Sequence, residues 1–328
     1  MTETMRQWWT VPGPDGGISE LRDVPVPQPG PGEVLVQVAG AGVNRGELIL
    51  RPALRSDNPN AKPSPSGNEF AGRVAAVGAG VTGWREGDRV MGRGRACQAD
   101  YTLTPAEALM AVPAGLSDEQ AAAIPNVFVT AHDAIVTAAQ AGQEDAVLIT
   151  AGSSGVGTAA IQIARYLGCR DVVATTTSPA KAEALRALGA THVADTSADG
   201  WPAALTDAVG PVDAVIDQVG GRLFPGLLEA MALKGRYVSV GRNDGAHASI
   251  DLDLVARQRL HLIGVTFRTR TPAETLACSQ RFAEDLLPAF GSGALRPVLD
   301  RAFPLDRLAD AHAYMLGNSQ LGKIVLMP

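Results

Sequence analysis

The sequence has few of the residues that disulfides, metal clusters and nucleic-acid surfaces need. Only three of its 328 residues are cysteines, and their wide spacing argues against a disulfide framework or a cysteine-rich metal site. No run of about 18 apolar residues is present, so no transmembrane helix is expected. A net charge of −6 argues against nucleic acid as a main partner, and an aromatic content of 5% disfavours a base-stacking surface. With no apolar secretion signal at the N-terminus, these absences favour a cytoplasmic protein.

Motifs of hydrolases and metalloenzymes are missing as well. The five histidines are scattered without paired spacing, and we interpret each as a surface or helix residue. Neither a GxSxG elbow nor a phosphate-binding Gly-Lys-Ser/Thr loop occurs. What the chain does have is 46% hydrophobic residues, which is typical of a globular protein with a sizeable core. Its length predicts about two domains.

The pattern of apolar residues changes along the chain. Up to about residue 120, short β-type runs are separated by Gly and Pro, which predicts a compact β-rich domain. Strands are expected there at 34–38, 74–77 and 89–91. Between 147 and 265 a strand-then-helix pattern repeats, which favours βαβ units and a doubly wound parallel sheet. Its six expected strands begin or lie at 147–150, 171–174, 193, 212–216, 236–240 and 261–265, with helices at 156–167 and 179–188. The tail returns to a mixed pattern, with helices at 272–290 and 308–315 and strands at 298–303 and 323–327.

The most specific motif is the run from Ala151 to Gly157, AGSSGVG. It follows an apolar strand and opens a helix, as a dinucleotide-binding loop does, although Ala151 stands where the first glycine of GxGxxG is expected. Small residues let the backbone approach a pyrophosphate, which the free amides and positive dipole end of the helix then bind. The alternative is a glycine-rich turn without a ligand. The residues expected to bind the cofactor here are Ala151, Ser153, Ser154, Gly155 and Val156.

The end of the second strand indicates which nicotinamide nucleotide is bound. NAD-dependent enzymes usually have an acidic residue there for the ribose hydroxyls. This chain has Thr177 and Ser178 instead, followed by Lys181. Hydroxyls and a cation suit a 2′-phosphate, so we expect NADPH rather than NADH. Ser178 can also serve simply as the cap of the helix that begins at Pro179.

Several short motifs, taken in order, resemble the medium-chain dehydrogenase/reductase superfamily and within it the zinc-independent, zeta-crystallin-like quinone oxidoreductases. The resemblance covers essentially the whole chain. The motifs are AGVN at 41–44, GNEFAG at 67–72, GDRV at 87–90, the loop at 151–157, Lys181 with LGA at 188–190, and GKIVL at 322–326.

This resemblance implies an α/β protein in which a GroES-like β-rich catalytic domain, 1–122 and 267–328, surrounds a Rossmann domain with a six-stranded parallel sheet, 123–266. It also implies a cofactor cleft between the domains and a homodimer joined at the edge of the Rossmann sheet. The substrate is expected to be a small molecule.

Alignment of these motifs places Asn44, Asn68 and Asn126 where zinc-dependent relatives have their metal ligands. Amides are poor substitutes for thiolate or imidazole, so no metal is expected. The resemblance puts Asn44 and Thr130 beside the nicotinamide, and Asn68 and Asn126 where they can donate hydrogen bonds to a substrate oxygen. Asn is also common in turns, and these amides can simply cap turns. The four residues are the catalytic candidates, and Asn44 and Thr130 are also expected to contact the cofactor.

The remaining candidates are less sharply defined. Gly241 follows the fifth strand at its carboxyl end, where ligands bind. Phe267 follows the sixth strand and can reach either the cofactor or a subunit contact. Gly220 and Lys323 complete the expected cofactor-binding set.

Without a metal, the expected reaction is direct hydride transfer from NADPH to a quinone or an α,β-unsaturated carbonyl. Ile49 stands about where several family members have a tyrosine that is proposed to assist, which leaves water as a proton source. Two other interpretations remain open. One is an enoyl reductase of secondary metabolism, and the other is a nucleotide-binding redox sensor with little turnover.

Overall fold

The computed structural model describes residues 3–49 and 51–328. These residues form two compact units, one built from Met1–Asn126 and Ser279–Pro328 and the other from Val127–Cys278. The helix α9 (Pro272–Gly291) contains the second point of division. The domain boundaries predicted from the sequence, at 122/123 and 266/267, both fall earlier in the chain than these two points of division. The extent of the functional domains stays a prediction.

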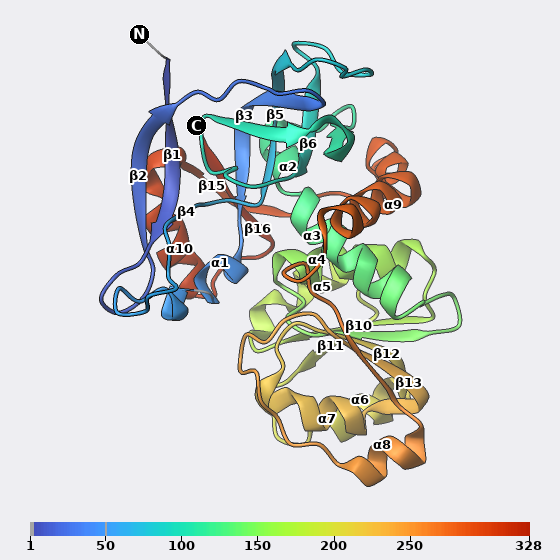
Figure 1. Cartoon of the computed structure of the whole chain (residues 1–328). Helices are drawn as coiled ribbons and strands as arrows, with labels where there is room; N and C mark the ends of the chain where they lie inside the picture. Colours follow the sequence, from blue (N-terminus) through green and yellow to red (C-terminus); the bar gives the residue numbers. More distant parts are fainter. Residues whose placement is uncertain (1–2, 50) are drawn as a thin grey trace. The chain divides into compact units, whose positions relative to one another are not determined.

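The first unit contains two β-sheets. The larger has the strand order β15-β16-β3-β5-β6-β8, with β7 also paired to β3, and the smaller has the order β2-β1-β4 (Figure 1). Their bounds are β1 Thr4–Val11, β2 Ile18–Pro25, β3 Glu33–Val43, β4 Ser64–Pro65, β5 Glu69–Val77, β6 Arg89–Arg93, β7 Tyr101–Pro105, β8 Leu109–Ala111, β15 Leu299–Pro304 and β16 Lys323–Met327.

Strand β3 is the centre of this unit. It pairs with β5, β7 and β16. The amino-terminal and carboxyl-terminal segments of this unit therefore join in one sheet through β3. Its residues Val34, Val36 and Val38 are buried in one apolar cluster with Phe70, as expected for alternate side chains on one face of a strand. The β1–β2 hairpin was not expected from the sequence. The buried side chain of Trp8 holds it in place.

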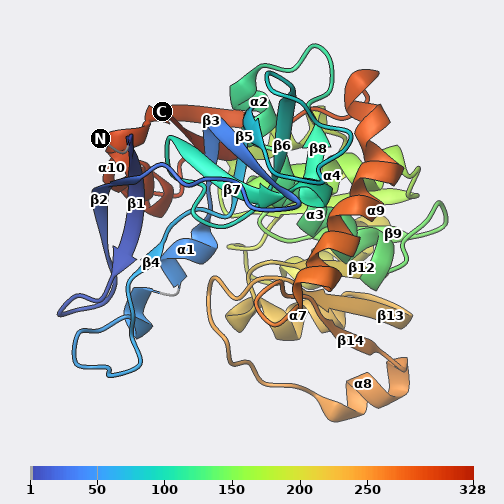
Figure 2. The same cartoon turned by 45° about the horizontal axis from the view of Figure 1, so that its top comes forward.

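Short helices complete the first unit. They are α1 (Arg45–Ile49), α2 (Asp118–Ala122) and α10 (Leu308–Leu316). Ser117 and Gln120 form a reciprocal capping box that starts α2. The segment 51–63 between α1 and β4 is mostly loop, seen beside α1 in Figure 2.

The second unit is a six-stranded sheet with the order β11-β10-β9-β12-β13-β14, and every neighbouring pair is parallel. This order is that of the doubly wound dinucleotide-binding fold, in which the direction of winding reverses between β9 and β12. The predicted fold class is therefore confirmed. The strands are β9 Ala146–Ile149, β10 Asp171–Thr176, β11 His192–Asp195, β12 Val212–Asp217, β13 Met231–Ser239 and β14 His261–Gly264.

Helices pack on this sheet through small and aliphatic side chains. In α4 the fully buried residues Ala159, Ala160 and Ile163 allow close approach to the strands. The predicted helix 179–188 begins as a 3₁₀ turn at 179–181 and continues directly as α5. The helices of this unit are α4 Gly155–Tyr166, α5 Ala182–Ala187, α6 Trp201–Val209, α7 Phe224–Glu229 and α8 Leu252–Gln258. Helix α3 (Pro125–His132), continued by a π-helical turn at 133–138, contains the first point of division, after Asn126.

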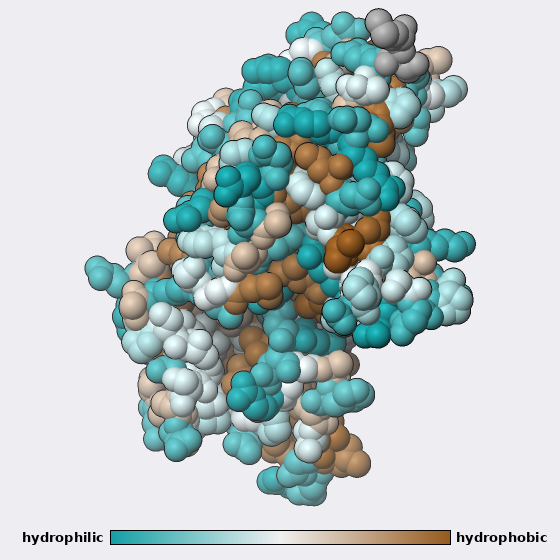
Figure 3. Space-filling view, turned by 90° about the vertical axis from the view of Figure 1, so that its left-hand side faces the viewer, coloured by the Kyte–Doolittle hydropathy of each residue, from teal (hydrophilic) through white to brown (hydrophobic). Residues whose placement is uncertain are grey.

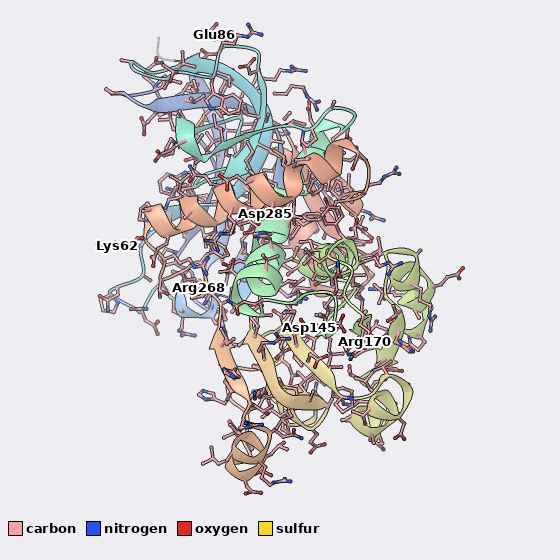
Figure 4. All side chains as sticks on the ribbon, turned by 90° about the vertical axis from the view of Figure 1, so that its right-hand side faces the viewer. Lys62, Glu86, Asp145, Arg170, Arg268 and Asp285 are labelled. Carbon is pink, nitrogen blue, oxygen red and sulfur yellow. The ribbon has the colours of Figure 1, made fainter. Side chains whose placement is uncertain are left out.

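Charged residues cover the amino ends of these strands. Arg170 bonds to Asp213 at 3.2 Å and to Asp171 at 3.3 Å, and Arg236 pairs with Asp145. Asp145 and Arg170 lie at the same end of the unit in Figure 4. The opposite, carboxyl end is the one where open α/β sheets bind ligands.

Figure 3 shows apolar residues in separate small patches among hydrophilic ones on the side of the molecule that faces the viewer there. Among the described residues, no helix combines the length and the apolar character needed to cross a membrane.

Candidate functional site

The glycine-rich loop lies at the carboxyl end of β9, where the winding of the sheet reverses. Ala151 adopts a left-handed conformation with φ +48°. A side chain at Gly157 would place its Cβ 2.3 Å from the carbonyl oxygen of Ala151, so only glycine fits there. At Gly152 a Cβ would lie 2.9 Å from that of Ala174. The loop therefore folds tightly onto its own helix and onto β10, as a phosphate-binding turn requires.

Backbone amides at the start of α4 are available to a ligand. Ser154 caps the helix by accepting from the Gly157 amide at 3.0 Å. The amides of Ser153, Gly155 and Val156 have no partner within 3–49 and 51–328. Unpartnered amides at a helix N-terminus favour an anion. The chemistry of these amides suits the pyrophosphate of a dinucleotide. The Gly157 amide is not available to a ligand, because it already donates to the Ser154 hydroxyl.

A buried hydrogen-bond network supports the loop from below. The Ser154 hydroxyl donates to Gln218 Oε1 at 2.8 Å, and Gln218 Nε2 donates to the Thr150 carbonyl at 2.8 Å. Thr150 in turn donates to Asp217 Oδ1 at 2.7 Å. The network thus links the ends of β9 and β12 to the helix cap.

Asp217 is fully buried and accepts from four groups. These are the hydroxyls of Thr150 and Tyr237 and the amides of Val219 and Gly220. Burial, together with the charge of Asp217, raises the pKa of Tyr237, so the phenol remains a donor. Sequence reasoning missed Asp217 and Gln218, although Asp217 ends an apolar strand at the reversal point of the sheet.

The residues that are predicted to bind the 2′-phosphate of NADPH follow the end of β10. Thr177 is exposed, and Ser178 and Lys181 are partly exposed. The Ser178 side chain makes no capping bond to the turn at 179–181, so the capping alternative is wrong. No acidic residue stands between 172 and 182.

The other residues predicted on this unit lie in different environments. Gly220 and Gly241 both sit at the end of β12, since each amide donates to Asp217. A Cβ at Gly241 would meet the Gln218 carbonyl oxygen at 2.4 Å. The ring of Phe267 lies 4.6 Å from the guanidinium of Arg270. Thr130 is buried in α3 with 9% of its surface exposed.

In the first unit, the structure brings together the three asparagines that the sequence singled out. Asn44 Nδ2 donates to Asn68 Oδ1 at 2.9 Å, and Asn126 Nδ2 donates to Asn44 Oδ1 at 2.8 Å. We call Asn44, Asn68 and Asn126 the amide cluster. The alternative that these side chains merely cap turns does not describe their contacts with one another.

A buried ion pair holds the amide cluster. Lys323 Nζ lies 2.6 Å from Glu69 Oε1, and the side chains are 4% and 0% exposed. Lys323 also donates to Asn44 Oδ1 and to the Val43 carbonyl, both at 2.9 Å. Glu69 accepts from Asn44 Nδ2 at 2.7 Å and from the Asn126 amide at 2.7 Å. All three hydrogens of the ammonium are therefore used by protein acceptors, and any contact of Lys323 with a cofactor would break one of these bonds.

Glu69 was not among the predicted site residues. It is visible in the motif GNEFAG, and a neighbouring glycine makes room for it. A Cβ at Gly42 would lie 2.1 Å from Glu69 Oε1. A glycine within a strand is a signal for such a close approach, and it could have drawn attention to a partner on the paired strand β5.

Comparison with known proteins identifies the family. Residues 30–136 match the alcohol dehydrogenase GroES-like domain, and residues 155–284 match the family described as zinc-binding dehydrogenase. The chain belongs to the medium-chain dehydrogenase/reductase superfamily. Members of this superfamily are oxidoreductases, and the GroES-like match agrees with the β-rich first unit.

Relatives within the superfamily include large synthases. The chain is 32% identical over 329 residues to the spectinabilin polyketide synthase system protein NorB of Streptomyces orinoci. That match covers 98% of this chain but 14% of NorB. The chain spans between 5% and 14% of the length of this and two further polyketide synthase relatives.

Solved structures of the superfamily match the chain along nearly its whole length. An NAD-dependent alcohol dehydrogenase is 29% identical with a TM-score of 0.87, covering 98% of this chain and 99% of its own. A mycobacterial protein complexed with NADPH is 28% identical with a TM-score of 0.87, covering 99% and 100%. A mycobacterial quinone oxidoreductase is 28% identical with a TM-score of 0.83, also covering 99% and 100%.

Zinc, which the name of one matching family implies, does not suit the amide cluster. Amide groups are weak ligands for zinc, and the Glu69 carboxylate, which accepts from the Asn44 side chain, is already paired with Lys323. The Lys323 ammonium, 2.9 Å from Asn44 Oδ1, would also repel a second cation. Among the described residues, no group of three or more His, Cys, Asp or Glu could share a metal ion.

Two of the histidines, which the sequence predicted to be surface or helix residues, lie buried in helices. His132 in α3 and His312 in α10 are 1% and 5% exposed. His312 Nδ1 lies 3.1 Å from an Arg51 nitrogen and its Nε2 lies 3.4 Å from Glu47 Oε2. Because arginine can only donate, Nδ1 accepts and Nε2 carries the proton in this arrangement.

Proposed function

We propose that the protein is an NADPH-dependent reductase that transfers a hydride, without a metal, to a quinone or an α,β-unsaturated carbonyl. The observation that carries this proposal is the set of unpartnered amides at Ser153, Gly155 and Val156. When bound, the nicotinamide supplies the hydride and water supplies the proton. The amides of the loop bind the pyrophosphate, and the amide cluster orients the acceptor.

Support for the acceptor class comes from the chemistry of the amide cluster. Amides cannot polarise an ordinary alcohol or ketone as a Lewis-acid metal does, so the acceptor must already be electron-poor. Conjugation provides this in quinones and enones, because it spreads the charge that develops on the oxygen. Similarity to a quinone oxidoreductase agrees with this choice.

The experiment that tests the proposal is the oxidation of NADPH by the purified protein with a panel of simple quinones and enones. Turnover with either class supports the proposal. Tight binding of NADPH without turnover on any acceptor contradicts it and favours a redox sensor. Absence of NADPH binding by calorimetry contradicts both.

A second candidate, an enoyl reductase that acts on polyketide-like thioesters, is favoured by the likeness to NorB. In the same assay it would reduce an α,β-unsaturated thioester much faster than a quinone of similar electron affinity. Saturation of the carbon–carbon double bond, detected by mass spectrometry, distinguishes this reaction.

Replacement of Lys181 by alanine should weaken NADPH binding about 10- to 100-fold, because a charge-assisted hydrogen bond contributes roughly 1.5–3 kcal/mol. Binding of NADH should change less than about twofold, since it has no 2′-phosphate. Calorimetric titration of both nucleotides measures this. The matched control is Lys62→Ala in the exposed loop, where Lys62 is labelled in Figure 4. Equal weakening of NADPH and NADH would remove Lys181 from the 2′-phosphate site.

We also propose that two copies associate along β14. This strand is the outermost of the six-stranded sheet and has a neighbour on only one side (Figure 2). Leu262 on β14 and Leu252 on α8 are 45% and 71% exposed. An unpaired edge with exposed apolar residues is a template for pairing with a second chain.

Leu262→Lys should therefore convert a dimer to a monomer in sedimentation velocity, because a lysine on the edge opposes strand pairing. Leu316→Lys is the control, since Leu316 is similarly exposed, at 59%, on α10. A wild-type protein that sediments as a monomer would refute the proposed dimer.

A further inference from the structure

The direction of each amide in the amide cluster can be worked out from groups whose hydrogen-bonding role has no alternative. The Val43 carbonyl can only accept and the Asn126 backbone amide can only donate. They are bonded to Lys323 Nζ at 2.9 Å and to Glu69 Oε2 at 2.7 Å, respectively. Lys323 is thus the donor and Glu69 the acceptor, as an ammonium and a carboxylate are.

This ion pair leaves one orientation for Asn44. Its oxygen faces Lys323, and its nitrogen faces Glu69 Oε1 at 2.7 Å. A rotated amide would set N–H groups against the ammonium and an oxygen against the carboxylate, which is unfavourable on both sides. In many proteins the two ends of an amide are hard to tell apart, but here the charges on either side decide.

The orientation of Asn44 then determines those of its two neighbours. Asn44 gives its second hydrogen to Asn68 Oδ1, so Asn68 turns its NH₂ group away from the cluster. Asn44 Oδ1 accepts from Asn126 Nδ2, so Asn126 turns its oxygen away. Within 3–49 and 51–328, Asn68 Nδ2 and Asn126 Oδ1 have no partner. Both residues are only partly buried, whereas Asn44 has all four of its hydrogen-bonding positions filled.

We propose that the buried Glu69–Lys323 pair is a device that sets the polarity of the amide cluster. Asn68 then presents N–H donors to the oxygen of the acceptor and is the catalytic residue. Asn44, Glu69 and Lys323 are positioning residues that make no contact with the substrate. This inference rests on the proposed function for the identity of the acceptor, but the polarity itself does not depend on turnover.

The chemistry of Asn68 follows from this polarity. When a hydride adds to the β carbon of an enone or to a quinone ring, the carbon–carbon π bond breaks and negative charge accumulates on the carbonyl oxygen. Two N–H groups held in place before the reaction stabilise that charge without reorganisation. The proton that neutralises the oxygen comes from water. Asn126 presents an oxygen, which would repel the same charge, so the two outer amides have different roles.

The polarity is tested first without any substrate. In nitrogen-15-labelled protein, the carboxamide hydrogens of Asn44 should exchange with solvent at least about tenfold more slowly than those of Asn68, because only the former are donated to protein groups. Asn44→Ala and Asn68→Ala identify the two NMR signals. Equal exchange, or slower exchange at Asn68, would overturn the proposed polarity.

The role of Asn68 is tested with acceptors of graded electron affinity. Asn68→Ala should lower kcat/KM about 100- to 1000-fold, with NADPH affinity within about twofold of wild type. The loss should be greatest for the least electron-poor acceptors, which need the donor most, so the dependence of kcat/KM on electron affinity becomes steeper. A purely structural effect would lower kcat/KM by the same factor for every acceptor, and that result would overturn the assignment. Asn60→Ala, in the exposed loop, controls for the substitution itself.

A double-mutant cycle separates positioning from contact. If Asn44 acts through Asn68, Asn44→Ala should lower kcat/KM when it is introduced into the wild-type protein. When it is introduced into the Asn68→Ala variant, it should lower kcat/KM by less than about threefold. Additive losses would mean that Asn44 contacts the substrate itself, which contradicts the proposal. A wild-type protein that binds NADPH but reduces none of the acceptors would refute the proposed function, and the exchange measurement would still decide the polarity.

Discussion

Lys323→Met is expected to lower the free energy of unfolding by about 3–5 kcal/mol, because it leaves a buried carboxylate without its cation. Glu69 is fully buried, and among its partners in the described part of the chain Lys323 is the one that carries a charge. Methionine keeps most of the volume of the lysine stem, so packing changes little. Urea denaturation followed by circular dichroism measures the loss.

Two further variants show that the charge, and not the side-chain volume, is responsible. Lys62→Met, at an exposed position, should change stability by less than about 0.5 kcal/mol. Adding Glu69→Gln to Lys323→Met should restore at least about half of the loss, since no unpaired charge then remains. A single Lys323→Met variant within about 1 kcal/mol of wild type would show that the pair contributes little.

Asp217→Ala is the change with the second largest expected effect, a loss of about 3–5 kcal/mol in the second unit. It removes the acceptor of four donors, and each buried donor left without a partner costs about 1–3 kcal/mol, partly offset by water that enters the space. Since the same network holds the Ser154 cap through Gln218, NADPH binding should weaken as well. Thermal unfolding and calorimetric titration measure the two effects.

Asp253→Ala is the matched control for Asp217. The Asp253 side chain is 78% exposed on α8 and forms a surface pair with Arg257, so its removal should cost less than about 0.5 kcal/mol. Loss of stability at Asp217 with unchanged nucleotide affinity would show that the network supports the fold but not the loop.

The two networks have a common design. In each unit, a fully buried carboxylate accepts several hydrogen bonds and thereby orients a polar group that stays available to a ligand. Glu69 orients the amide cluster, and Asp217 orients the glycine-rich loop. A rigid support of this kind lets a site act without reorganisation when a ligand binds.

Local sequence patterns were sufficient to predict the second unit. Its strands are short apolar runs that alternate with helical segments, and both patterns reflect which face of each element is buried. The run AGSSGVG could be placed at a strand–helix junction because only small residues permit that turn, as the 2.3 Å distance at Gly157 shows. The β1–β2 hairpin was missed because every residue of β2 is either exposed or only partly buried, which leaves a weak apolar pattern.

The sequence by itself therefore determined the family, the doubly wound sheet and the three asparagines that are predicted to replace metal ligands. Only the tertiary structure showed that Glu69 meets Lys323, 254 positions away in the chain, and that Asn44 is enclosed between them. The physical reason is that secondary structure follows from interactions between near neighbours, whereas the direction of a side-chain amide depends on charges that folding brings together from distant strands. The same holds for Asp217 and Tyr237, which meet only because β12 and β13 pair in parallel.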